Sequence, residues 1–390
     1  MQRLRLFVFT VSHFCVDSYA SMLTPALPFV RDRLGLTFAQ IGLLGSFVQL
    51  SNLGQPLLGI LGDYLRGRWL IFVGIAVAAV FAPLIGVVPS FAWLVPCVML
   101  AGLGVSAFHP SGFALAGDLS GERRAFGLAL FIFGGTAALG FTPLWVPALV
   151  TTLGMGWLPL ATIPGLLMLP FVIAMVPAPS TPRSALPERV AEFRSALAPI
   201  GVIVATVIVR SIGGFGFAFF LPLLGQERGL SPLVWGMQLA VYNLSGVVGS
   251  LILGYLADRR DPKPLVLASL VLATPFMFLA LNADGLAALA MLAAGGTMAF
   301  ASNSIMVAMA QQHAPANAGF VSSLPGGFSW GVAGLTMPLF GLIADASGVL
   351  AAMRILAVLP LAAAVVGLLL PRRGARRPEL QPAGAEAARG

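Results

Sequence analysis

The chain has 390 residues and a formal net charge of +8; 58% of its residues are hydrophobic and only 9% are charged. A soluble domain carries about a quarter charged residues, so this composition excludes the soluble globular class. Apolar runs of about 20 residues, long enough to cross a bilayer as helices, follow one another almost to the end of the chain. We predict twelve transmembrane helices, in chain order at residues 6–30, 37–62, 69–89, 91–117, 123–153, 156–177, 197–225, 231–257, 263–282, 284–311, 315–346 and 348–371.

Basic residues gather in alternate loops between these helices. By the positive-inside rule, these loops and both chain ends are cytoplasmic, which requires an even number of spans. The loops on the other side hold little beyond Arg31, Arg33 and Arg228. The net charge therefore reflects orientation in the membrane and indicates no nucleic-acid partner. The cytoplasmic set comprises Arg3, Arg5, Arg66, Arg68, Arg123, Arg124, Arg183, Arg189, Arg194, Arg259, Arg260, Lys263, Arg372, Arg373, Arg376 and Arg377.

The second half of the chain repeats the pattern of the first. The stretch "GLTFAQIG" from Gly35 matches "GLSPLVWG" from Gly229, 194 residues later, and Pro143 and Pro338 stand 195 residues apart. An internal repeat across the middle of a polytopic chain is typical of transporters. Six spans in each copy is an even number, so the two copies have the same orientation in the membrane.

The repeat also predicts helix starts and domain boundaries. Thr37 and Ser231, at equivalent positions, can each cap the helix that follows, because a hydroxyl can accept from a free N–H of the first turn. The polar, proline-containing stretch in the middle of the chain separates the halves. We expect an N-terminal six-helix bundle at 1–177, a cytoplasmic linker at 178–196, a C-terminal six-helix bundle at 197–371 and a disordered cytoplasmic tail at 372–390.

Two charged stretches follow the second and eighth spans at equivalent positions. They read "GILGDYLRGR" and "GYLADRRDPK". An Asp at a helix end that faces Arg side chains across a loop forms a charge latch, which can hold one conformer and release it in another. Ordinary solvated loop charges are the alternative interpretation. The predicted latch residues are Gly59, Asp63, Arg66, Arg68, Gly254, Asp258 and Arg259.

Asp17 is the only acidic residue well inside a predicted span. Hydrocarbon favours a neutral carboxyl unless a cation compensates, and ionisable groups within spans are functional by default. His13 lies one helical turn away on the same face, and His109 precedes Pro110 in the fourth span. We predict that Asp17, His13 and His109 couple transport to protons. The alternatives are a structural His13–Asp17 pair, and a hydrogen bond from His109 to a carbonyl that Pro110 frees.

Arg210 lies inside the seventh span, where its guanidinium must meet water, an acid or an anionic substrate. Ser302, Asn303 and Ser304 add polar groups to the tenth span. We predict that these four residues bind substrate. Snorkelling of Arg210 to a membrane surface is the alternative for the arginine, and helix packing is the alternative for the other three.

The composition also bears on metal and enzyme chemistry. Cys15 and Cys97 lie inside predicted spans, with no disulfide framework and no metal-ligand spacing. We therefore expect no metal ion and no cofactor. The sequence contains no nucleophile–base arrangement and no phosphate loop, so we do not expect an enzyme.

In its repeat and its two charged loop stretches, the chain resembles the major facilitator superfamily. It is most similar to the fosmidomycin-resistance branch, through "SHFCVD" from Ser12, "GLGVSAFHPSG" from Gly102 and "GLIAD" from Gly341. Ser111 and Gln312 stand where that branch commonly has glutamates. The resemblance implies a monomeric all-α polytopic membrane protein with the major facilitator fold, in which twelve transmembrane helices form two pseudo-symmetric six-helix bundles. It also implies that helices one, four, seven and ten line a central cavity.

These features together predict a proton-coupled secondary active transporter of the bacterial cytoplasmic (inner) membrane that works by alternating access. The resemblance implies efflux, by antiport, of a small amphiphilic or anionic compound, either a drug or a metabolite. A proton-symport importer of a small metabolite and a non-transporting membrane sensor or partner protein are the alternatives. The expected partners are a small-molecule substrate, protons and the lipid bilayer.

Overall fold

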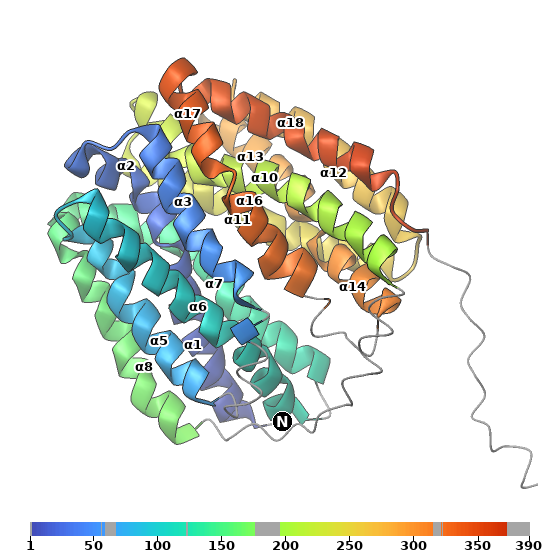
Figure 1. Ribbon diagram of the computed structural model, residues 1–390, viewed down its shortest axis with the longest axis horizontal. Coiled ribbons are helices and arrows are strands. Elements are labelled where there is room, and N and C mark those ends of the chain that lie inside the picture. The colour runs from blue at the N-terminus through green and yellow to red at the C-terminus, as the bar shows by residue number, and fades with distance from the viewer. Residues whose placement is uncertain are drawn as a thin grey trace, which may run out of the picture.

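The computed structural model describes residues 2–55, 57–58, 68–121, 124–175, 196–314, 321 and 323–372. Every regular element in these ranges is a helix, and eleven helices are long and apolar enough to cross a membrane (Figure 1). The predicted second span, 37–62, is described as α3 (Phe38–Leu53), and most of its last residues lie outside these ranges. The prediction of an all-α polytopic protein is confirmed.

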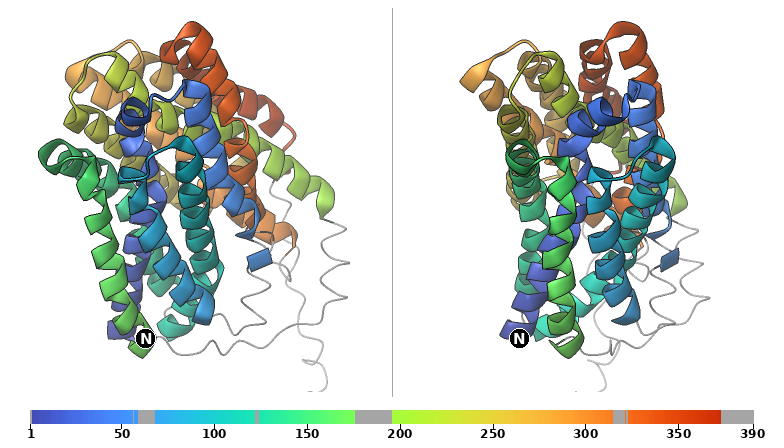
Figure 2. Two further views of the ribbon diagram at one scale, coloured as in Figure 1. Left: turned by 60° about the vertical axis from the view of Figure 1, so that its left-hand side comes forward. Right: turned by 90° about the vertical axis from the view of Figure 1, so that its left-hand side faces the viewer.

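The helices form two bundles, one from each half of the chain, as Figures 1 and 2 show. The N-terminal half contains α1 (Arg3–Ser21), α2 (Leu23–Leu34), α3, α5 (Arg68–Phe81), η1 (Pro83–Gly86), α6 (Phe91–Ser120), α7 (Arg124–Leu153), η3 (Met155–Ala161) and α8 (Thr162–Met175). The C-terminal half contains α10 (Leu197–Glu227), α11 (Pro232–Ala257), α12 (Pro262–Ala280), α13 (Gly285–Phe300), α14 (Asn303–His313), η5 (Leu324–Phe328), α16 (Ser329–Gly334), α17 (Met337–Ser347) and α18 (Val349–Gly367). Apart from Ala196 and Arg372, the predicted linker and tail lie outside the described residues.

Three predicted spans are interrupted helices rather than single rods. The first span divides at Met22 into α1 and α2, and the tenth divides between α13 and α14 at Ala301 and Ser302. The eleventh begins with the π-helical turn η5, in which Gly326 departs from helical φ and ψ. Such breaks free backbone groups and bend a helix, so apolar length alone did not predict them.

The two predicted helix caps differ. Thr37 caps α3 in a capping box: its hydroxyl accepts from the Gln40 backbone N–H at 3.1 Å, and the Gln40 side chain accepts from the Thr37 N–H at 3.0 Å. Ser231 is at the N-cap of α11, but its side chain makes no cap hydrogen bond, so that prediction was wrong. The Val234 N–H is already bonded to the Ser231 carbonyl at 2.9 Å.

The halves touch through two backbone contacts that the repeat relates to each other. In α3, a Cβ at Gly42 would overlap the Met337 carbonyl, next to Pro338 of α17. In α11, a Cβ at Gly236 would overlap the Pro143 carbonyl of α7. Gly42 and Gly236 stand 194 residues apart, so the pair of contacts has the pseudo-symmetry that the sequence predicted.

An ionisable side chain adds to one of these two contacts. Asp345 of α17 accepts hydrogen bonds from the backbone N–H groups of Phe38 and Ala39, both at 2.8 Å. These N–H groups belong to the first turn of α3, where the helix dipole favours a carboxylate. At the equivalent position 195 residues earlier the chain has Val150, so the second contact has no such acid.

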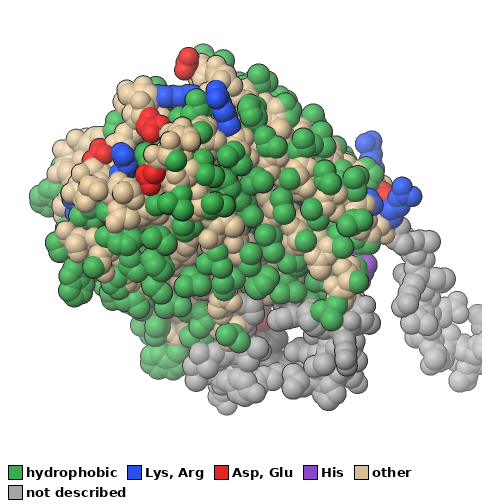
Figure 3. All heavy atoms as spheres, turned by 45° about the horizontal axis from the view of Figure 1, so that its top comes forward, with side chains coloured by type: hydrophobic (Ala, Val, Ile, Leu, Met, Phe, Trp, Pro, Cys, Tyr) green, Lys and Arg blue, Asp and Glu red, His purple; other side chains and the backbone are tan. Residues whose placement is uncertain are grey.

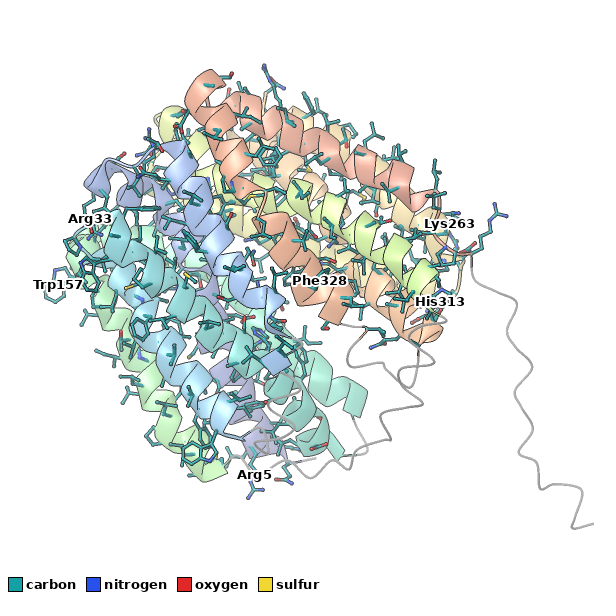
Figure 4. All side chains as sticks on the ribbon, in the orientation of Figure 1. Arg5, Arg33, Trp157, Lys263, His313 and Phe328 are labelled. Atoms are coloured by element: carbon teal, nitrogen blue, oxygen red, sulfur yellow. The ribbon has the colours of Figure 1, made fainter. Side chains whose placement is uncertain are left out.

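The outer surface matches a bilayer in its distribution of side-chain types. Hydrophobic side chains cover most of the face in Figure 3, while Lys, Arg, Asp and Glu gather at its ends. Figure 4 places Arg5 and Arg33 at opposite ends of the N-terminal half, and Lys263 at the far end of the C-terminal half. Large exposed apolar residues such as Leu251, Leu286 and Leu369 therefore face lipid.

Candidate functional site

The structure brings together three ionisable side chains from two helices of the N-terminal half. His13 and Asp17 are on α1, and His109 is on α6. His13 Nε2 lies 3.3 Å from Asp17 Oδ2, and His109 Nε2 lies 3.2 Å from Asp17 Oδ1. The two Nε2 atoms are 3.3 Å apart. We call these three residues the HDH cluster.

The far side of each imidazole fixes which nitrogen carries hydrogen. His13 Nδ1 lies 2.8 Å from the Phe131 carbonyl oxygen of α7, and His109 Nδ1 lies 2.8 Å from the Val105 carbonyl oxygen of α6. A carbonyl oxygen only accepts, so both Nδ1 atoms donate. In the neutral imidazoles both Nε2 atoms are therefore unprotonated, and each directs its lone pair at the cluster.

This arrangement leaves the HDH cluster without a hydrogen-bond donor between its two Nε2 atoms and its carboxylate. With both imidazoles neutral and the carboxyl ionised, three acceptor groups face one another at 3.2–3.3 Å and repel. Among the described residues, Asp17 Oδ1 has no hydrogen bond of acceptable geometry, although it is buried and within ion-pair distance of His109. A bound proton relieves this repulsion. A metal ion is the other group that could, because the three ligand atoms lie within 4.8 Å of one another.

Phenylalanine rings surround the HDH cluster and limit access to it. Phe131 stacks on His13 with ring centroids 4.1 Å apart, and Phe9, Phe108 and Phe113 complete the apolar wall. The His13 side chain is 3% exposed, whereas Asp17 and His109 keep 15% and 19% of their surface. The HDH cluster is therefore dry on one side and accessible on the side of Asp17 and His109.

Gly135 of α7 closes the cluster from behind. A Cβ at this position would overlap Asp17 Oδ2 and crowd His13 Nε2. Small residues allow helices to approach closely, and the neighbouring Gly134 packs on the Thr10 carbonyl of α1. The absence of a side chain at Gly135 is thus required by the site itself.

Gly135→Ala should displace Asp17 from the two histidines and reduce transport by about tenfold or more, because small misplacements of reacting groups have large effects on rate. Transport of an identified substrate into proteoliposomes measures the effect. Gly201→Ala is the matched control: this residue is also in a helix, and a Cβ there meets nothing within 4 Å. Equal loss in both variants would assign the effect to helix packing in general.

Arg210 of α10 is the predicted substrate residue with the most unusual environment. Its side chain is 1% exposed, so the snorkelling alternative does not describe this structure. One Nη donates to Asn303 Oδ1 of α14 and the other to Ser211 Oγ at 3.2 Å, while Nε has no hydrogen-bond partner in the part of the chain that the structure describes. No carboxylate among the described residues lies within ion-pair distance of Arg210. A buried, uncompensated guanidinium attracts anions.

The three polar residues at the tenth span have different surroundings. Asn303 contacts Arg210, as described. Ser302 is fully buried, and its hydroxyl has no partner among the described residues. Ser304 Oγ donates to the Ser250 carbonyl of α11 at 3.0 Å, so it ties two helices together. This contact favours the packing alternative for Ser304.

The Arg210–Asn303 contact and the HDH cluster occupy equivalent helix pairs. Asn303 follows His109 by 194 residues, the repeat spacing, and Arg210 follows Asp17 by 193. Both contacts therefore join the first and fourth spans of their own half. The HDH cluster and the Arg210–Asn303 contact are thus at equivalent places in the two halves, and the first contains an acidic residue while the second contains a basic one.

The predicted latch residues are described only in part. Gly59, Asp63 and Arg66 lie outside the described residues, as does the side chain of Arg68. In the second stretch, Gly254 packs near Ser304 Oγ and Asp258 is the C-cap residue of α11. Arg259 donates to the Tyr255 carbonyl at 3.2 Å and stacks on the Tyr255 ring, contacts that fit an exposed loop charge.

Sequence reasoning missed the Asp345 contact and the metal-binding geometry of the HDH cluster. The sequence gives Asp345 no partner, because only the docking of α17 on α3 places it at a helix start. His109 and Asp17 are 92 residues apart, so no ligand spacing along the chain could indicate that they meet. The expectation of no metal site was derived from the cysteines alone.

Comparisons with known proteins show the family to which the chain belongs. The family model of the Major Facilitator Superfamily matches residues 9–336 and again 203–389. The fosmidomycin resistance protein of Escherichia coli (strain K12) is 27% identical over 368 residues, covering 90% of this chain and 89% of the relative. The MFS-type transporter YfnC of Bacillus subtilis (strain 168) is 24% identical over 378 residues, covering 94% and 92%.

Two solved structures share the fold at low sequence identity. A bacterial homolog of the human lysosomal transporter Spinster, in an inward-facing and unoccupied conformation, has a TM-score of 0.81 at 16% identity, covering 95% of this chain and 96% of the other. A D-xylose–proton symporter has a TM-score of 0.74 at 15% identity, covering 95% and 98%. With the repeat, the helices and the family match in agreement, this chain belongs to the major facilitator superfamily and is a transporter similar to the fosmidomycin resistance protein.

Proposed function

We propose that this protein is a proton-driven exporter of a small amphiphilic or anionic compound that works by alternating access. The observation that carries the proposal is the HDH cluster, whose three facing acceptor groups need a proton. The cluster lies on the first and fourth spans, which the family resemblance assigns to the central cavity. A carboxylate and two imidazoles exposed to that cavity are suited to pick up a proton on one side of the membrane and release it on the other.

Exchange follows if proton and substrate exclude each other at this site. A singly protonated HDH cluster has a hydrogen bond between one imidazole and the carboxyl group and carries no net charge. A deprotonated cluster is an anion with free acceptors, so a donor group of an amphiphilic compound can take the place that the proton leaves. Binding of one therefore requires departure of the other, and an inward proton gradient drives the compound outward.

The C-terminal half supplies the positive charge in this proposal. Arg210 attracts an anionic group of the substrate, with Asn303, Ser302 and Ser304 as neighbouring polar groups. The guanidinium is covered in the described conformation, so direct contact requires movement of α10 or α14. The tenth span is already divided at Ser302, next to Asn303. This break can act as the hinge about which α14 moves.

The remaining assignments belong to the same proposal. The transporter is a monomer in the bacterial cytoplasmic membrane with both termini in the cytoplasm. The charged stretches after the second and eighth spans act as latches at the cytoplasmic end, and the Asp345 contact closes the opposite end. In this proposal the protein moves its substrate without changing it chemically, as transporters of the family do.

The test is drug susceptibility of an efflux-deficient bacterium that expresses this protein. Because of the named E. coli relative, the panel begins with fosmidomycin, followed by other phosphonates and unrelated amphiphiles. Protection against one compound, with outward movement of that compound that stops when the proton gradient is collapsed, is the expected result. Uptake of a metabolite driven by an inward proton gradient would contradict export and support the symport alternative.

Asp345→Asn should favour the conformer in which the end at α3 and α17 is open. The carboxylate accepts two backbone N–H groups at 2.8 Å, and its loss removes about 1–3 kcal/mol from the closed state. This difference shifts the conformational equilibrium by roughly 5- to 150-fold. Distances between spin labels on the two halves measure the populations. Asp284→Asn, an exposed acid without a side-chain cap bond, should leave them unchanged.

A further inference from the structure

The HDH cluster has the donor set of a transition-metal site. Two imidazole nitrogens and a carboxylate are ligands that zinc and its neighbours prefer, whereas magnesium and calcium prefer oxygen alone. Metal-ligating histidines usually donate their second ring N–H to a backbone carbonyl or carboxylate, which directs the free nitrogen at the ion. Both histidines do this, to the carbonyls of Phe131 and Val105.

The distances within the cluster fit a tetrahedral ion. Ligand atoms about 2.0–2.1 Å from a tetrahedral centre lie about 3.3–3.4 Å from one another. The two imidazole nitrogens are 3.3 Å apart, and each lies 3.2–3.3 Å from a different oxygen of Asp17. A cluster held only by short charged hydrogen bonds would have separations of about 2.7–2.9 Å instead.

The separation of the two rings is consistent with the same centre. The Nε2 atoms of His13 and His109 are 3.3 Å apart, and their ring centroids are 5.2 Å apart. If both rings point at one centre, these two distances place that centre about 2 Å from each nitrogen, which is the zinc–nitrogen bond length. The rings are nearly perpendicular, at 78°, which keeps their carbon atoms apart. Asp17 presents one oxygen toward each ring, and its Oδ1 lacks a hydrogen bond among the described residues.

We propose that His13, Asp17 and His109 bind one divalent transition-metal ion of the zinc class in place of the proton. His13 Nε2, His109 Nε2 and the Asp17 carboxylate supply three ligands, and a water molecule from the accessible side takes the fourth position. Three protein ligands with one open position are typical of sites that exchange ligands. The metal takes the lone pairs that hold the proton, so the proton is released to solvent. Each metal ion that binds therefore displaces one proton.

The elements packed around the cluster add no competing charge. Helices α6 and α7 contribute His109 as their only titratable group within reach of Asp17 among the described residues. Metal binding should therefore depend on these three groups alone among the described residues. Block of transport by the bound ion is a further consequence, which rests on the proposed function.

The experiment is a Co²⁺ titration of the untagged, purified full chain, followed by the visible absorption of four-coordinate cobalt. We expect one Co²⁺ per chain, displacement of cobalt by Zn²⁺, and release of protons into weakly buffered solution. Asp17→Asn and His109→Gln should each weaken binding by at least about tenfold. His313→Gln is the matched control, because His313 is the third and last histidine of the chain and lies at the end of α14, outside the cluster.

The outcomes separate this proposal from proton-driven export. No cobalt absorption, or binding that His313→Gln removes and His109→Gln does not, overturns the metal site. Circular dichroism and size-exclusion chromatography of each variant identify any that fail to fold, and for those X-ray absorption of zinc bound to the native chain decides instead. Two nitrogen ligands at about 2.0–2.1 Å support the site, and an all-oxygen shell overturns it. None of these measurements requires a transported substrate, so their failure leaves the transport proposal standing.

Discussion

Asp17→Asn is expected to abolish both the accumulation of substrate driven by a pH gradient and the exchange of substrate across the membrane. The asparagine amide cannot bind or release a proton, but it has the shape of the protonated acid. Its NH₂ group can donate to a histidine Nε2 at the position where Asp17 lies 3.2–3.3 Å away. The variant should therefore resemble a permanently protonated HDH cluster, which neither carries protons nor accepts the donor group of the substrate.

Proteoliposomes measure the two activities separately. Uptake of labelled substrate under an imposed pH gradient and exchange of internal for external substrate should both fall to the level of empty liposomes. Asp284→Asn, a surface acid at the start of α13, is the matched control and should retain both activities. If Asp17→Asn still accumulates substrate against its gradient, the coupling site is elsewhere.

Arg210→Met is expected to remove high-affinity binding of an anionic substrate while the protein remains folded. Loss of one partner from a buried charged contact costs about 3–5 kcal/mol, which corresponds to a loss of about 10²-fold or more in affinity. The folded state itself should lose little, because Arg210 is buried with no carboxylate partner among the described residues and with an unpaired Nε. A buried ion replaced by an apolar side chain of similar volume is often tolerated.

Substrate binding and thermal unfolding of the same preparations distinguish the two roles of Arg210. Arg210→Lys should fall between the native protein and Arg210→Met, because lysine keeps the charge but not the planar fork that reaches both Asn303 and Ser211. Arg354→Met is the control at an exposed arginine of α18. If Arg210→Met unfolds at a much lower temperature and Arg354→Met does not, Arg210 is a structural residue.

The number and order of the spans could be predicted because that information is local. Each apolar run must satisfy its own backbone in lipid, and so forms a helix wherever it lies in the fold. The repeat was also readable, since Gly42 and Gly236, and Pro143 and Pro338, recur at the repeat spacing. These features do not depend on the rotation of any helix about its axis.

The chemistry of the site does depend on such rotations, and it could be predicted only in part. The His13–Asp17 pair is encoded by four-residue spacing on one helix. The approach of His109, the carbonyl partners of both histidines and the open space at Gly135 arise from how α1, α6 and α7 cross. Crossing geometry is set by many packed side chains together, so a single chain position does not reveal it.

The glycine contacts at Gly42 and Gly236 bear on how fast the protein can change shape. At both places main chain lies directly on main chain, with no side chain between the halves. At such a contact one helix can tilt over the other without any side chain changing its rotamer. The barrier to the relative motion of the two halves must then come from the polar groups that close the ends, above all Asp345 where α17 meets the start of α3. A transporter built this way has its speed set by a few hydrogen bonds, and its two hinges can stay in place while those bonds are changed.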